Sequence, residues 1–275
     1  MTTDNNEVLV ALGAAVSGAR VMEDGSLTPY AFLPPGYSVH ELEFLRESPA
    51  HKRAAVKVID SDSFCAYIAD HKTAGTRIYA NFDIVCEGLS LVAVLDDHSA
   101  GSAGWRHHTC TLDRRKSIEW GRWASKNHVH MPQSDFARFL EENLADIVTA
   151  EGMPTGSEML QMALAFERTA DKRLKSKVNL QSGGVRFEYV DDDTAETRTS
   201  MQVFSRFAIG IPVFECAKAA YQIEARLKYR DNAGKVAFWY ELIRSDRAFR
   251  KAVDDELTAI SEATGLKIIK GTPGV

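Results

Sequence analysis

Residues 221–244 read YQIEARLKYRDNAGKVAFWYELIR, and this stretch carries the clearest structural pattern of the chain. In residues 221–230 apolar and polar side chains alternate without interruption, which is typical of a strand with one buried face. Residues 231–234 supply turn chemistry, and residues 235–244 return as a second strand. The stretch therefore predicts an antiparallel hairpin. Its expected inward residues on the first strand are Tyr221, Ile223, Ala225, Leu227 and Tyr229, and its outward residues are Gln222, Glu224, Arg226, Lys228 and Arg230.

The register of this hairpin is predicted from its turn. A turn centred between residues 232 and 233 places Leu227 opposite Phe238, so that both apolar side chains lie on the inward face. A slip by one residue would set apolar side chains against polar ones. In the same register Arg226 lies opposite Trp239 on the outward face, where the two could form a cation–π pair.

The remaining chain predicts an α+β fold. We expect an antiparallel β-meander at about residues 176–244 that is packed by helices, and a β-hairpin-containing N-terminal half. Neither a βαβ alternation nor a Gly-rich phosphate loop is present, which argues against Rossmann and P-loop folds. A helix should follow the meander and end at Gly265; its apolar stripe is Phe249, Val253, Leu257 and Ile260.

The chain length and the positions of Gly- and Pro-containing breaks predict one main domain. Residues 1–20 should form a flexible or short-helix N-terminus, and residues 21–270 a single α+β domain. An alternative division lies near residues 151–175, where Gly and Pro residues are followed by a basic run.

Composition indicates a globular protein that works in the cytoplasm. The chain has 275 residues, is 45% hydrophobic and carries a net charge of −5, so its overall field would not attract nucleic acid, although a local basic patch still could. Its four cysteines form no C-x-x-C pair and are expected to be reduced. The acidic start MTTDNNE is unlike a signal peptide, and the apolar run Val8–Val16 is too short to cross a membrane.

A cluster of carboxylates and imidazoles is the first candidate site. The β-like run 89–95 is followed by an Asp-Asp-His, a loop of small residues, and a second run that starts with two histidines, which predicts a hairpin with these side chains at its base. Carboxylate and imidazole groups bind divalent transition metals, and a metal could activate water for hydrolysis. The alternatives are a polar hairpin end that caps backbone groups and a non-metal binding site. The residues are Asp96, Asp97, His98, His107 and His108; the metal or catalytic hypothesis uses Asp96, His98 and His108, with His107 as a further ligand.

The outward face of the 221–244 hairpin is the second candidate site. Basic side chains interleaved with an aromatic one can hold single-stranded nucleic acid, with charge on phosphates and stacking on bases. The alternatives are a solvated sheet face and a protein–protein interface, since Trp239 and Ile243 interrupt the polar pattern. The candidate binding residues are Arg226, Lys228, Arg230, Lys235 and Trp239, extended by Lys172, Arg173 and Lys175.

Three other tryptophans favour a structural role. Trp105, Trp120 and Trp123 are expected in the core or packed on a hairpin rather than in a ligand cage. Serine and cysteine residues have no recognisable histidine partner, so covalent catalysis has little support.

Three segments of the chain form a recognisable set: VAVLDDHSAGSAGWRHHTCTL (92–112), SIEWGRWASKNHVHMPQSDFARFLEENLADI (117–147) and FAIGIPVFECAKAAYQIEARLKYRDNAGKVAFWYELIRSDRAF (207–249). Together they resemble the YfdQ-like family of phage and prophage proteins. The resemblance covers roughly residues 55–270, in order. It implies a cytoplasmic, phage-encoded protein that is not part of the virion, and it implies no particular activity.

Two functions are compatible with these patterns. The first is a non-enzymatic accessory or binding protein without a cofactor, assembled as a homo-oligomer, whose partner is single-stranded nucleic acid, a host protein or a nucleotide-like small molecule. The second is a metal-dependent hydrolase or nuclease that uses Asp96, His98 and His108 with a divalent transition metal.

Overall fold

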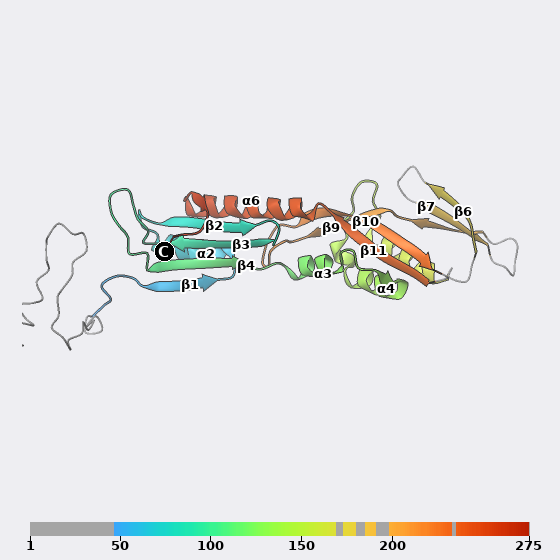
Figure 1. Cartoon of the computed structure of the whole chain (residues 1–275), viewed down its shortest axis with the longest axis horizontal. Helices are drawn as coiled ribbons and strands as arrows, with labels where there is room; N and C mark the ends of the chain where they lie inside the picture. Colours follow the sequence, from blue (N-terminus) through green and yellow to red (C-terminus); the bar gives the residue numbers. More distant parts are fainter. Residues whose placement is uncertain (1–46, 169–172, 180–184, 191–197, 233–234, 275) are drawn as a thin grey trace, which may run out of the picture. The chain divides into compact units, whose positions relative to one another are not determined.

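A computed structural model describes residues 47–168, 173–179, 185–190, 198–232 and 235–274. The chain divides into two compact units, residues 1–52 and 53–275, and every described helix and strand belongs to the second unit (Figure 1). The predicted N-terminal segment 1–20 lies outside the described residues. The alternative division near 151–175 falls inside the second unit and stays a prediction.

A five-stranded sheet occupies the first part of this unit. Its order is β1-β4-β3-β2-β12. The predicted hairpin is confirmed as β3 and β4, which pair antiparallel from Leu89↔Arg114 to Val94↔Thr109. Two pairings were not predicted: β1 runs parallel to β4, and β12 parallel to β2. The bounds are β1 Ala54–Val58, β2 Arg77–Asp83, β3 Gly88–Val94, β4 His108–Arg114 and β12 Ile268–Lys270.

Two helices supply the apolar side chains that complete the core beside this sheet. In α2 (Ser61–His71) the Asp60 side chain accepts a hydrogen bond from the Ser63 N–H at 2.7 Å and so caps the first turn. In α6 (Ser245–Thr264), the long helix in Figure 1, the predicted stripe is confirmed as buried. Gly265 ends α6 with a φ of 70°, a left-handed conformation that suits glycine.

The middle of the chain is helical and packs around Trp123. This side chain is fully buried, and its ring centroid lies 4.9 Å from that of Phe139, 5.3 Å from Tyr240 and 5.9 Å from Phe207. Trp120 is also buried, as predicted. Trp105 is 70% exposed, which excludes the core; its ring lies 5.8 Å from that of His107 at the base of the β3–β4 hairpin, in line with the other predicted position, packing on a hairpin. The elements are α3 Ile118–Lys126, β5 Met131–Pro132, α4 Gln133–Glu142, the 3-10 helix η2 Leu144–Asp146 and α5 Gly156–Arg168.

The predicted meander is present, but it is divided between two sheets. The first has the order β6-β7-β8, and the second β5-β11-β10-β9. In the second sheet the predicted inward residues Ile223, Ala225 and Leu227 are buried. The bounds are β6 Arg173–Asn179, β7 Val185–Val190, β8 Arg198–Val203, β9 Arg206–Ile211, β10 Tyr221–Asn232 and β11 Lys235–Ile243.

The register of β10 and β11 differs by two residues from the prediction. Leu227 lies opposite Tyr240, and Asn232 lies opposite Lys235, so the connection holds only residues 233 and 234. A shift by two keeps every side chain on its predicted face, because the side-chain period of a strand is two. It changes the neighbours on the outward face: Trp239 lies opposite Lys228, and the predicted partner Arg226 lies opposite Glu241 instead.

Within the described ranges, none of the helices has the combination of length and apolar character that crossing a bilayer requires.

Candidate functional site

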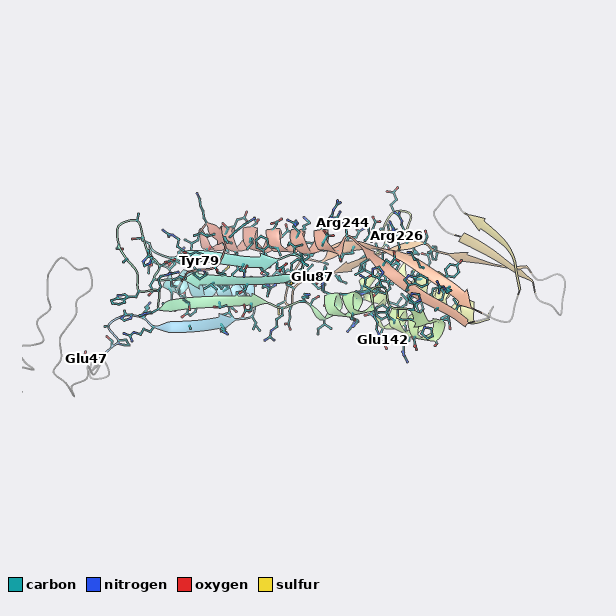
Figure 2. All side chains as sticks on the ribbon, in the orientation of Figure 1. Glu47, Tyr79, Glu87, Glu142, Arg226 and Arg244 are labelled. Atoms are coloured by element: carbon teal, nitrogen blue, oxygen red, sulfur yellow. The ribbon has the colours of Figure 1, made fainter. Side chains whose placement is uncertain are left out.

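The outward side chains of the four-stranded sheet form what we call the basic face. On β10 they include Arg226, Lys228 and Arg230, all three exposed (Arg226 is labelled in Figure 2). Successive outward residues of a strand lie about 7 Å apart. β10 therefore presents a row of three cationic side chains along its length, as the sequence predicted. We define the face as Arg206, Glu224, Arg226, Lys228, Arg230, Trp239 and Glu241, with His130 at its edge.

Two carboxylates, Glu224 and Glu241, also lie on the basic face, and the prediction of a binding site did not consider their charge. Lys228 Nζ donates to Glu241 Oε1 at 2.5 Å, and this hydrogen bond holds the pKa of Glu241 below its usual range. Arg206 lies 3.8 Å from Glu224. Neither Arg226 nor Arg230 forms an ion pair with any side chain that the structure describes. The uncompensated positive charge of the face is therefore concentrated on these two arginines.

Arg206 and Arg226 lie directly opposite each other on neighbouring strands. Two like charges in such a cross-strand pair repel and destabilise the sheet. Glu224 offsets the charge of Arg206 only partly, because both side chains of that pair are about half exposed to water. An anion between the two guanidinium groups would relieve the repulsion and accept charge-assisted hydrogen bonds from both.

An aromatic pair lies on the β5–β11 side of the basic face. The His130 ring stacks on the Trp239 ring with a centroid distance of 4.1 Å and an interplanar angle of 9°. His130 is exposed, whereas Trp239 is partly buried. Met131 of β5 pairs antiparallel with Phe238 of β11. This pairing places the preceding residue, His130, beside Trp239. The sequence patterns did not single out His130. The pairing of β5 with β11 joins segments about a hundred residues apart, and it leaves no local signal in the sequence.

For the other predicted basic residues the structure describes the backbone alone or nothing. Lys172 lies outside the described residues. Arg173 and Lys175 belong by their backbone to β6, which is part of the separate three-stranded sheet. Lys235 starts β11 opposite Asn232, and only its backbone is described. Their role in binding stays a prediction.

The Asp/His cluster lies, as predicted, at the base of the β3–β4 hairpin. The Asp96 carboxylate accepts the backbone N–H groups of His107 at 2.9 Å and of His108 at 3.0 Å. His98 Nδ1 accepts the backbone N–H of Gly104 at 3.0 Å. His108 Nε2 lies 2.7 Å from the hydroxyl of Tyr67 on α2. These contacts cap backbone groups and tie the hairpin to α2.

This arrangement gives the metal hypothesis no coordinating geometry. Among the residues that the structure describes, no group of three or more His, Cys, Asp or Glu side chains is placed so that it could hold a metal ion. Asp96 and His98 are each directed at a backbone amide. The arrangement matches the alternative of a polar hairpin end.

Asp97 is the buried carboxylate of this hairpin. It accepts hydrogen bonds from the Tyr79 hydroxyl at 2.7 Å and from the His98 N–H at 2.8 Å, and its Oδ1 lies 3.1 Å from Arg106 Nε (Tyr79 is labelled in Figure 2). Burial alone would raise the pKa of Asp97. The two hydrogen bonds and the Arg106 charge outweigh burial, and the pKa lies below its usual value.

We expect Asp97→Asn to destabilise the protein at neutral pH and much less in acid. A carboxylate whose pKa is lowered by folding stabilises the folded state above its unfolded pKa of about 4, and this stabilisation is lost as the pH falls through and below that value. The expected loss at pH 7 is about 1–3 kcal/mol in the free energy of unfolding. Urea denaturation at pH 7 and near pH 3 measures it. Asp113→Asn, at an exposed carboxylate, is the control; a loss for Asp97→Asn that is equal at both pH values would contradict the assignment.

A cleft of about 280 Å³ lies between the start of α2, the segment 214–221 and α6. Arg114 lines it, with Nε 3.0 Å from Glu256 Oε1, and the Ser61 hydroxyl also donates to Glu256. Tyr221 donates to Asp255 at 3.0 Å, and Lys218 to Asp62 at 2.8 Å. These charged side chains at the cleft are thus paired with neighbouring side chains.

The fold and the site define a mixed α+β protein with a basic sheet face and without a described metal centre. Over residues 2–273 the chain matches the family described as "Uncharacterized conserved protein (DUF2303)", and it belongs to that family. No curated protein and no solved structure matches it. The finer resemblance to YfdQ-like phage proteins stays a prediction.

Proposed function

We propose that this protein is a non-enzymatic accessory protein of a phage or prophage that binds single-stranded nucleic acid on its basic face. The observation that carries the proposal is the combination of two exposed arginines without described counter-ions, Arg226 and Arg230, with the stacked His130–Trp239 pair on the same face. We further propose that it works in the host cytoplasm, outside the virion, as a homo-oligomer.

The chemistry of the face favours an unpaired strand as the ligand. Proteins that hold single strands combine cationic side chains that follow the backbone with aromatic side chains on which bases stack. The basic face has both kinds of group, on strands that also supply the buried core. The net charge of −5 argues that binding depends on this local patch rather than on the overall field.

We expect the double charge reversal Arg226→Glu and Arg230→Glu to weaken binding of a single-stranded oligonucleotide at least tenfold at low salt. Two phosphate contacts are lost, and each such contact contributes about 0.7 to the slope of log affinity against log salt for single strands. The slope should therefore fall by about 1.4. Fluorescence anisotropy of a labelled oligonucleotide, titrated at several salt concentrations, measures both quantities.

A matched control separates a local site from a general charge effect. Lys57→Glu with Lys267→Glu changes the net charge equally at two exposed positions, on β1 and next to β12, in the five-stranded sheet. This variant should bind nearly as well as the wild type. Equal losses in both variants, or no binding by the wild type at low salt, would disprove the proposal; capture of a host protein without oligonucleotide binding would point to the protein-partner alternative.

A further inference from the structure

We infer that the basic face holds one nucleotide as a unit, with an unpaired base on His130 and the adjoining phosphate between Arg206 and Arg226. The inference rests on the proposed function and names the ligand feature that the site recognises. It assigns binding roles to His130 and Arg206, which the sequence patterns did not single out.

We call the exposed His130 ring the base platform. Its proposed role follows from the stacking geometry. His130 covers Trp239 with nearly parallel rings, and His130 is itself exposed to solvent. The pair is thus a stack in which His130 is the more exposed ring. Imidazole rings accept stacked bases in proteins that recognise single-stranded RNA. A base that stacks on His130 would continue the column that Trp239 begins.

The phosphate position follows from the charges. Arg206 and Arg226 are directly opposite each other in the register of β9 and β10, so both basic side chains start from the same part of the outward face. Guanidinium groups form paired hydrogen bonds with phosphate, and two of them would share its negative charge. Glu241, opposite Arg226 on β11, repels phosphate from the aromatic side of the sheet. The backbone of the strand is therefore expected over β9–β10 and the base over β5–β11.

The distances between these groups suit one nucleotide. The aromatic pair and the arginine pair are separated by two strand spacings, about 10 Å, across the sheet and by two residues, about 7 Å, along it. Long arginine side chains can span much of this separation. A duplex would keep its bases stacked inside, out of reach of His130, so the platform should select unpaired bases.

Binding of three probes tests the inference: a short single-stranded oligodeoxythymidylate, an abasic phosphodiester chain of the same length, and a duplex of the same length. The wild type should bind the oligodeoxythymidylate about tenfold tighter than the abasic chain, since stacking favours each stacked base. His130→Ala should remove this difference and leave affinity for the abasic chain unchanged, whereas His130→Phe should retain it. Arg206→Ala and Arg226→Ala should weaken both single-stranded probes by the same factor.

The outcomes separate this inference from the proposed function. No binding of any probe by the wild type would remove both. Equal affinity for the oligodeoxythymidylate and the abasic chain, unaffected by His130→Ala, would overturn the base platform while leaving an anion-binding face. Unchanged binding by Arg206→Ala would overturn the phosphate position. Melting curves of each variant show whether it is folded, and His130→Phe keeps the test valid if His130→Ala is unstable.

Discussion

Replacing Arg114 by methionine is expected to lower the free energy of unfolding by about 3–5 kcal/mol, because it leaves a buried carboxylate without its cation. The Arg114 side chain is 1% exposed and that of Glu256 is 14% exposed, with Nε and Oε1 3.0 Å apart. Arg114 also donates to the Ile59 carbonyl at 3.2 Å and lies over the Phe214 ring at 5.2 Å. Methionine retains much of the packing volume, so the loss reports the ion pair together with the hydrogen bond to Ile59 rather than a cavity. Urea denaturation at neutral pH measures it.

Removing both charges should restore much of this stability. Buried ion pairs that are replaced by apolar residues of similar volume are often neutral or stabilising. The double variant Arg114→Met with Glu256→Leu is therefore expected to be clearly more stable than Arg114→Met alone. Lys218→Ala, which breaks the fully exposed pair with Asp62, should leave the melting temperature unchanged. If Arg114→Met and Lys218→Ala behave alike, the buried pair does not have the assigned role.

Trp123→Ala is expected to destabilise the protein by about 3–5 kcal/mol, through loss of apolar contacts and the cavity that remains. The indole is fully buried among Phe139, Phe207 and Tyr240, and its Nε1–H donates to Asp146 at 2.7 Å. Its backbone carbonyl accepts the Tyr240 hydroxyl at 2.6 Å. Chemical denaturation followed by far-ultraviolet circular dichroism measures the change.

Two further variants show which part of Trp123 matters. Trp123→Phe keeps an aromatic ring but loses the hydrogen bond to Asp146, so an intermediate loss is expected. Trp105→Ala removes an indole that is 70% exposed and should have little effect on stability. A loss for Trp105→Ala as large as that for Trp123→Ala would mean that burial does not set the cost.

The sequence predicted the local structure of the main elements well. Uninterrupted alternation in residues 221–230 predicted which side chains of β10 face the core, and the structure confirms it. Gly265 marked where α6 ends. Such signals work because strand period, helix caps and left-handed glycines depend on a few neighbouring residues.

The composition of the candidate sites was predicted less completely. Arg226, Lys228, Arg230 and Trp239 do share one face, but Glu241 neutralises Lys228, and the alternation pattern gives no measure of that pairing. Asp96 and His98 do lie at the base of one hairpin, yet each is directed at a backbone amide. The direction of a short polar side chain depends on local loop geometry, which spacing in the sequence does not specify.

Local sequence patterns were enough to predict the two faces of β10, the end of α6 and the basic character of one sheet face. The residues that meet on that face became known from the folded chain: the register shift by two, the opposition of Arg206 and Arg226, and the stacking of His130 on Trp239. The physical reason is that periodicity reports what one segment buries. The choice of partner strand and register depends on packing between segments that are far apart in the chain.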